Sequence, residues 1–269
     1  EVDPCESMLA EVNERELKVD AIINISASPF EAAKKKKRFS RAKNISLQFG
    51  CPFIYVNRVG GEDEILFDGG SFIMAGSNVS VELKSFEADQ KSVVLEIIEG
   101  EYSAKPEFHK ENTWEGLFSP KIDSKTSPAT LRIWSDEECE EVMKALIFGL
   151  QEYANKSGFK KFLVALSGGM DSALVLALVK MGLRPGQSLE AIYMPSIYSS
   201  PVSTELSESM CKGLKIPLSY FPIKFLHSAV KNAFTQNFLE PFEGLTDENV
   251  QSRLRGTLLY TRSNQTGAM

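Results

Sequence analysis

Apolar positions change their spacing along the chain, and this change predicts a mixed α/β protein. A helical spacing comes first, at Met8, Leu9, Val12 and Leu17, which should share one buried face. Short apolar runs then predict buried strands at residues 20–26, 52–59 and 64–74 and an alternating strand at 79–83. A lysine-rich helix is expected after the first run, as far as about residue 49. Turns are expected at Gly60-Gly61 and Gly76.

The second half of the chain alternates strand and helix. Ser135 and Glu138 form a capping-box pattern ahead of a helix that should end at Gly158. Strands are predicted at residues 161–166, 189–194 and 218–221, and helices at 171–181, 203–214, 224–237 and 247–263. This alternation predicts a parallel sheet covered by helices on both faces.

Residues 101–134 separate the two patterns. Periodicity gives way there to proline, serine, lysine and single aromatic residues, which is typical of a linker between domains. We therefore expect one domain over residues 1–100, a linker over 101–134 and a second domain over 135–269. Neither end of the sequence shows the strand that an α/β domain would place there, so we expect a piece of a longer chain.

Composition excludes several classes of function. The net charge of −6 disfavours a nucleic-acid partner. No run approaches the ~20 apolar residues that span a membrane, so a cytoplasmic protein without a membrane partner is expected. The cysteines lack the paired spacing of a zinc site and are predicted to be reduced, buried or incidental thiols: Cys5, Cys51, Cys139 and Cys211. His109 and His227 are predicted to be surface or packing residues, because neither lies beside a nucleophile.

The candidate chemistry lies in a glycine-rich turn between a buried strand and a helix, SGGMDS at residues 167–172. Two glycines let the backbone approach a phosphate, and the helix N-terminus supplies N–H groups and a positive dipole end. Ser167 and Ser172 can add hydroxyl donors, and Asp171 is a candidate Mg²⁺ ligand beside phosphate oxygens. The loop patterns of kinases, GTPases and dinucleotide-dependent oxidoreductases are absent. A plain turn with a capping aspartate is the alternative.

This turn resembles the phosphate-binding loop of the ATP pyrophosphatases, enzymes that split ATP between its α and β phosphates. Two further segments are similar to the NAD synthetases of that family, MPSIYSS at 194–200 and ENVQSRLRG at 248–256. The resemblance implies an ATP site, with Met194 near the adenine, at Ala165, Leu166, Ser167, Gly168, Gly169, Met170, Asp171, Ser172 and Met194. It implies that Asn249, Arg253 and Arg255, which lie off the apolar stripe of Val250, Leu254 and Leu258, bind deamido-NAD.

The first domain is similar to the glutaminase domain of glutamine-dependent NAD synthetases, a nitrilase-type α-β-β-α sandwich. The likeness rests on NISASPF at 24–30, YVNRVGG at 55–61 and FDGGSF at 67–72. It implies that Ser28 and Lys34 contact glutamine, although Ala33 stands where many members of the family have glycine. Neither Cys5 nor Cys51 follows a strand, so the catalytic cysteine, glutamate and lysine of the glutaminase are expected upstream of Glu1.

The resemblance as a whole implies a ligase of NAD biosynthesis, in which a Rossmann-like parallel-sheet domain of the adenine nucleotide α hydrolase type follows the partial sandwich. Ammonia from glutamine would amidate deamido-NAD through an adenylated intermediate, with ATP and Mg²⁺ as cofactors, in a homo-oligomer. Two alternatives are a GMP-forming or tRNA-modifying ATP pyrophosphatase and an inactive nucleotide-binding fragment. The acidic charge and the NISASPF segment argue against the first of these.

Overall fold

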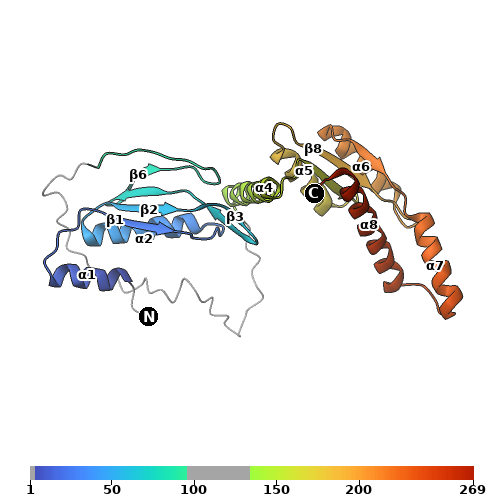
Figure 1. Ribbon diagram of the computed structural model, residues 1–269, viewed down its shortest axis with the longest axis horizontal. Helices are drawn as coiled ribbons and strands as arrows, with labels where there is room; N and C mark the ends of the chain where they lie inside the picture. Colours follow the sequence, from blue (N-terminus) through green and yellow to red (C-terminus); the bar gives the residue numbers. More distant parts are fainter. Residues whose placement is uncertain (1–3, 96–133) are drawn as a thin grey trace. The chain divides into compact units, whose positions relative to one another are not determined.

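The computed structural model describes residues 4–95 and 134–269 and has the predicted mixed α/β character. Residues 101–133 of the predicted linker lie outside the described residues. The chain forms two compact units divided between Ala145 and Leu146, inside helix α4 (Asp136–Ser157). The predicted domain bounds stay a prediction. Figure 1 shows the elements of each unit.

The first unit is built on a four-stranded sheet in the order β1-β2-β5-β6. Strand β1 (Ile22–Ser26) runs parallel to β2 (Phe53–Asn57), whereas β5 (Phe72–Ala75) and β6 (Asn78–Glu82) continue the sheet antiparallel. Helix α2 (Lys34–Phe49) lies along one face of this sheet (Figure 1). Its core is apolar and comprises Ala42, Ile45, Phe53, Tyr55, Phe72 and Met74.

Glycine conformation explains where the predicted strands of this unit were wrong. The expected strand at 64–74 is two strands, because Gly69 and Gly70 adopt φ of 64° and 60°, which extended backbone does not allow. The first half is β4 (Ile65–Asp68), which pairs with β3 (Val59–Glu62) in a separate two-stranded sheet. Gly60-Gly61 is therefore inside a strand and forms no turn, whereas Gly76, with φ of 57°, does lie in a turn between β5 and β6.

The predicted burial of β1 was also wrong. Ile23 and Ile25 are 64% and 84% exposed, and Val56 of β2 is 42% exposed on the same face. This face points away from the α2 core, so burial of these side chains needs a layer that the described residues do not supply. Helix α1 (Pro4–Glu14) ends before Leu17, and of the four expected apolar positions only Leu9 is buried.

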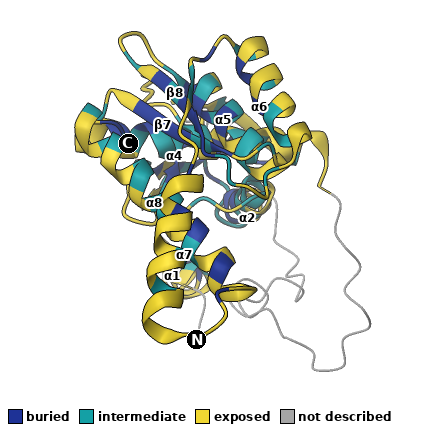
Figure 2. Ribbon diagram, turned by 90° about the vertical axis from the view of Figure 1, so that its right-hand side faces the viewer, coloured by how far each residue is buried: buried dark blue, intermediate teal, exposed yellow. Residues whose placement is uncertain are grey.

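The second unit contains the predicted parallel sheet, in the order β7-β8-β9. Its strands are β7 (Lys161–Leu166), β8 (Ser188–Tyr193) and β9 (Leu218–Tyr220). Side chains alternate along β7, as a strand requires. Phe162, Val164 and Leu166 join one core cluster, whereas Leu163 joins the cluster on the other face. Figure 2 shows β7 and β8 as largely buried, beneath helices whose outer faces are exposed.

Helices cover both faces of this sheet, as predicted. α4, α5 (Met170–Gly182) and α6 (Pro201–Leu214) pack on one face, and α8 (Leu245–Thr266) packs on the other. Helix α7 (Lys224–Phe238) contacts α8. The capping box before α4 is formed: Ser135 N donates to Glu138 Oε2 at 3.0 Å, and Glu138 N donates to Ser135 Oγ at 3.3 Å. No helix among the described residues is both long and apolar enough to cross a membrane.

Candidate functional site

The carboxyl ends of β7 and β8 bring two of the predicted segments together. Leu166 pairs with Tyr193 across the parallel ladder, so the turn that begins at Ser167 and the segment that begins at Met194 leave the sheet side by side. Ligands of open parallel sheets bind at this edge, where the loops after neighbouring strands converge. The register of the sheet therefore places the SGGMDS and MPSIYSS segments side by side, as one candidate site.

The SGGMDS turn is held in shape by its own serines. Ser167 N donates to Ser172 Oγ at 3.2 Å, Ser172 Oγ donates to Gly169 O at 3.0 Å, and Gly169 N donates to Ser167 Oγ at 3.2 Å. The two hydroxyls thus order the turn, in addition to any contact with a ligand. Helix α5 starts at Met170 without a side-chain cap. Its first N–H groups therefore keep the unpaired character that suits an anion.

Gly168 is the most constrained position of the turn. Its φ is 80°, and a Cβ added there would lie 2.6 Å from the carbonyl oxygen of Ser203. Ser203 belongs to the first turn of α6, where Ser200 accepts a hydrogen bond from its N–H at 3.2 Å. The missing side chain of Gly168 thus lets the turn touch the backbone of a second helix N-terminus.

Asp171 fits the predicted role of a cation ligand. It lies in the first turn of α5 and is exposed, and no hydrogen bond or ion pair within the described residues engages its carboxylate. The described residues also contain no group of three or more metal-ligating side chains. A Mg²⁺ ion at Asp171 would therefore need phosphate oxygens and water for its other ligands, which is how proteins usually bind Mg²⁺ beside nucleotides.

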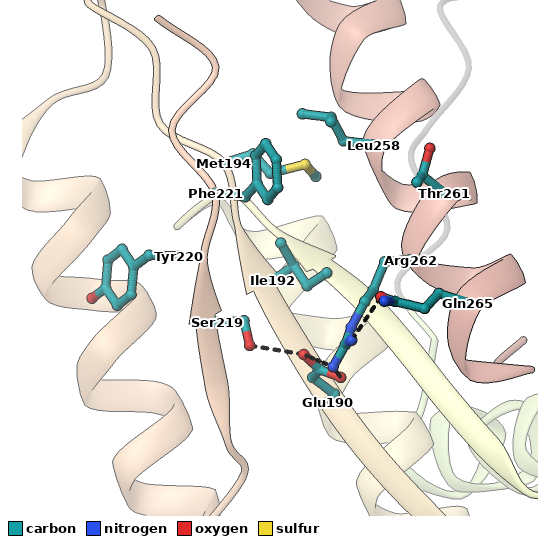
Figure 3. Close-up of a pocket in the computed structure, with 10 residues that line it drawn as sticks. All are labelled: Glu190, Ile192, Met194, Ser219, Tyr220, Phe221, Leu258, Thr261, Arg262 and Gln265. Atoms are coloured by element: carbon teal, nitrogen blue, oxygen red, sulfur yellow. Dashed lines mark hydrogen bonds and ion pairs between the residues drawn. The ribbon is translucent and has the colours of Figure 1, made fainter. Parts of the chain in front are cut away.

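Met194 lines a cavity of about 300 Å³ between β8, β9 and α8 (Figure 3). Its apolar wall consists of Ile192, Met194, Phe221 and Leu258. At the other end Glu190 accepts hydrogen bonds from Ser219 Oγ at 2.7 Å and from Arg262 Nη2 at 2.9 Å. The cavity is thus apolar beside Met194 and is lined at the far end by the ion pair between Glu190 and Arg262.

The three residues predicted to bind deamido-NAD all lie on α8, but their environments differ. Asn249 and Arg253 are exposed and lie one turn apart on the same side of the helix. Arg255 is half-buried, its Nε donates to the carbonyl oxygen of Met194 at 3.0 Å, and burial lowers its pKa. The predicted stripe of Val250, Leu254 and Leu258 is only partly buried. The buried positions of α8 are instead polar: Asp247 and Gln251.

Sequence reasoning missed a cluster that joins the segment 194–200 to α8. His227, on α7, is 1% exposed, and its Nε2 contacts the carboxylate of Asp247. The hydroxyl of Tyr198 donates to the other oxygen of that carboxylate at 2.9 Å. Burial raises the pKa of Asp247, but the hydrogen bonds from His227 and Tyr198 outweigh burial and lower it overall. His227 is thus a packing residue with a specific partner, which its sequence context did not indicate.

In the first unit the two predicted glutamine contacts lie on one short segment. Ser28 N donates to Asn57 Oδ1 at 2.9 Å, and Lys34 Nζ donates to the carbonyl oxygen of Pro29 at 3.1 Å. Ala33 precedes α2 with φ of 64°. This is the left-handed region in which glycine is favoured, which explains why a glycine suits this position.

The two buried cysteines of the described chain carry no sign of activation. Cys51 is buried, and desolvation together with the charge of Asp20 raises its pKa to about 11. Burial also raises the pKa of Cys211. A nucleophilic cysteine needs a lowered pKa, so neither thiol has the environment of a catalytic cysteine.

Comparisons with known proteins agree with this geometry. Residues 142–269 match the family model described as NAD synthase. Across 93% of its length the chain is 32% identical to the glutamine-dependent NAD(+) synthetase of Synechocystis sp., and across 91% it is 33% identical to that of Aquifex aeolicus. It covers 40% and 44% of these proteins, so the chain spans less than half the length of either relative.

A solved structure shows the same fold. The glutamine-dependent NAD+ synthetase from Acinetobacter baumannii, solved in complex with adenosine diphosphate, has a TM-score of 0.73 and 24% sequence identity. The match covers 98% of this chain and 45% of that one. The likeness therefore includes the first unit, which lies outside the residues that match the NAD synthase model.

Proposed function

We propose that the protein is a glutamine-dependent NAD synthetase, a ligase that uses ATP to amidate deamido-NAD with ammonia from glutamine. One observation carries this proposal. The SGGMDS turn lies at the carboxyl edge of a parallel sheet, beside an uncapped helix N-terminus, within the residues that match the NAD synthase model. That arrangement suits the pyrophosphate of ATP, because free N–H groups and a helix dipole point toward the same space.

The remaining parts of an ATP site lie within reach of this turn. The apolar end of the cavity beside Met194 suits a purine ring, since flat heteroaromatic groups bind in apolar clefts with few polar partners. Asp171 would hold Mg²⁺ against the phosphate oxygens, where the cation offsets charge that develops on the departing pyrophosphate. The ATP-binding set is thus residues 165–172 together with Met194.

The reaction follows from this placement. The nicotinate carboxylate of deamido-NAD attacks the α-phosphorus of ATP, the bond to the β-phosphate oxygen breaks, and pyrophosphate leaves while an acyl adenylate forms. Ammonia then attacks the acyl carbon and displaces AMP, which gives the amide. Asn249 and Arg253 would bind the dinucleotide from one side of α8, and Arg255 would fix that helix to Met194. Catalysis here rests on positioning and charge complementarity rather than on a protein nucleophile.

The first unit supports a glutaminase of the nitrilase type. Such a sandwich packs two sheets face to face, and the sheet of the first unit has one face covered by α2 and one apolar face exposed at Ile23, Ile25 and Val56. A second sheet on that face would complete the sandwich. We also propose that Ser28 and Lys34 contact glutamine, and that the enzyme is a cytoplasmic homo-oligomer.

The test of the synthetase assignment is the variant Asp171→Ala in the intact protein. With ATP, Mg²⁺, deamido-NAD and ammonia supplied, we expect the formation of AMP and pyrophosphate to fall by at least about a hundredfold, because one Mg²⁺ ligand is lost. Glu205→Ala removes an exposed carboxylate from α6 of the same unit and should leave the rate unchanged. Undiminished AMP formation by Asp171→Ala would refute the assignment.

A further inference from the structure

A buried arginine organises the segment that carries Ser28. Arg38 lies on α2, and its side chain is 10% exposed. Its Nη1 donates to Asp68 Oδ2 at 2.6 Å. Its Nη2 donates to three oxygens of the preceding segment: Ser28 Oγ at 3.1 Å, Ser28 O at 3.2 Å and Pro29 O at 3.3 Å. One guanidinium therefore ties the 28–29 segment to the end of β4.

Asn57, at the end of β2, holds the same segment from the other side. Its Oδ1 accepts the hydrogen bond from Ser28 N at 2.9 Å, and its Nδ2 donates to Asp68 Oδ1 at 3.3 Å and to Gly69 O at 3.1 Å. Asn57 and Asp68 are 7% and 5% exposed. The N–H, carbonyl and hydroxyl groups of Ser28 are thus all fixed by buried partners, and its position does not depend on solvent.

The contact to Ser28 Oγ also fixes the direction of the hydroxyl hydrogen. Because Arg38 Nη2 donates to this oxygen, the hydroxyl cannot point its own hydrogen at the guanidinium, which has no acceptor. The hydrogen must point away from Arg38. Ser28 can therefore donate this hydrogen to an acceptor on the other side, such as a carbonyl or carboxylate oxygen.

Stability alone does not explain this arrangement. A buried ion pair is often no more stabilising than apolar residues of the same volume, because both charges lose their hydration. In addition, Arg38 Nε is buried without a hydrogen-bond partner among the described residues. The ring of Tyr55 lies beneath the guanidinium, and its hydroxyl is also buried without a hydrogen-bond partner among those residues. Unpaired buried polar groups destabilise a fold, so their presence here needs an explanation other than stability.

We propose that Arg38 is a positioning residue of the glutamine site: it holds Ser28 so that the hydroxyl donates a hydrogen bond to an oxygen of bound glutamine. This inference rests on the proposed glutaminase function. Arg38 itself does not touch glutamine. It acts through Ser28, and Asp68 and Asn57 complete the support.

The test uses the two nitrogen sources of the intact protein. Arg38→Lys keeps the charge beside Asp68, but a lysine cannot donate to Asp68 and to Ser28 in a forked arrangement. We expect kcat/KM for glutamine to fall about tenfold to a hundredfold, mainly through KM, as the loss of a charge-assisted hydrogen bond implies. The rate with saturating ammonia should stay within about twofold. Arg15→Lys, at an exposed ion pair on the first unit, is the matched control.

Two further measurements separate positioning from folding. Ser28→Ala should reproduce the loss with glutamine, and the double variant Arg38→Lys/Ser28→Ala should lose little more than either single variant, since both break one interaction. Additive losses of kcat/KM in the double variant would overturn the inference. Equal losses of activity with glutamine and with ammonia in Arg38→Lys would also overturn it, as would a loss of hydrogen-exchange protection in β2 of that variant. If the unaltered protein makes NAD from neither nitrogen source, the proposed function itself fails. If it makes NAD from both and the variants show no difference between them, only the role of Arg38 fails.

Discussion

Replacing Gly168 by alanine tests how the SGGMDS turn is built. A non-glycine residue at φ of 80° costs about 1–2 kcal/mol relative to glycine. The new Cβ would also lie 2.6 Å from the Ser203 carbonyl oxygen and 2.7 Å from Ser203 Cα, so the backbone of α6 has to move. Overpacking of this kind costs about 1–3 kcal/mol. The two contributions sum to a loss of about 2–5 kcal/mol for Gly168→Ala.

Two other glycines of the second unit, Gly186 and Gly169, separate these contributions. Gly186 has φ of 83° and nothing within 4 Å of an added Cβ, so Gly186→Ala should lose only the conformational part, about 1–2 kcal/mol. Gly169 has φ of −87°, and its added Cβ would meet only the side-chain oxygen of Ser167 at 3.3 Å, so Gly169→Ala should cost least. The free energy lost by Gly168→Ala beyond that of Gly186→Ala measures the contact with Ser203.

Native-state hydrogen exchange of the β7 amides is the suitable assay, because it reports the opening of the second unit without interference from the first. Titration calorimetry with Mg-ATP on the same variants should show the weakest binding for Gly168→Ala, since movement of the α6 N-terminus changes the shape of the turn. Equal losses of stability in Gly168→Ala and Gly186→Ala would show that the contact with Ser203 yields easily and that the reasoning is wrong.

Two further predictions concern titratable groups. With iodoacetamide at pH 7.5, exposed Cys139 should react first and Cys51 should stay unmodified, because a pKa of about 11 leaves roughly one thiolate in three thousand. Alkylation of Cys51 at a rate equal to that of Cys139 would contradict its burial. The folded-state pKa of Asp247 lies below its ordinary 3.8, so its ionisation stabilises the fold above that value, and the stability should be lost as pH falls through the lower folded-state pKa. Asp247→Asn should reduce this acid dependence in β7 hydrogen exchange, and an unchanged slope would contradict the role of Asp247.

Hydrophobic spacing predicts an element well where the apolar pattern continues from one end of the element to the other. β7 and α5 agree with the sequence prediction to within a residue, because a continuous apolar run and a helical repeat both persist across them. The prediction failed where a backbone angle decides the structure. Nothing in an apolar run at 64–74 shows that Gly69 and Gly70 take positive φ and end the strand. Residue type also could not show that Ile23 and Ile25 would be exposed, since their burial depends on a further layer of structure.

The candidate site divides in the same way. That the turn at 167–172 lies beside Met194 could be predicted, because parallel strands place successive loops at one edge. Arg38 and His227 could not. Arg38 meets Asp68 thirty residues away through the fold of the first unit, and His227 meets Asp247 across two helices. A single buried charge leaves no periodic trace in a sequence, so only tertiary structure reveals its partner.

Helix α8 is fixed to the carboxyl edge of the sheet at two points, and this determines where the proposed dinucleotide contacts lie. Asp247, in its first turn, accepts the hydrogen bond from Tyr198, and Arg255, two turns later, donates to the carbonyl oxygen of Met194. Both partners belong to the segment that follows β8. Two attachments on one rigid helix set its direction as well as its distance, because rotation about either contact would break the other. Asn249 and Arg253 lie between these attachments, so in the proposed reaction their placement relative to the ATP turn is set by the two attachments together.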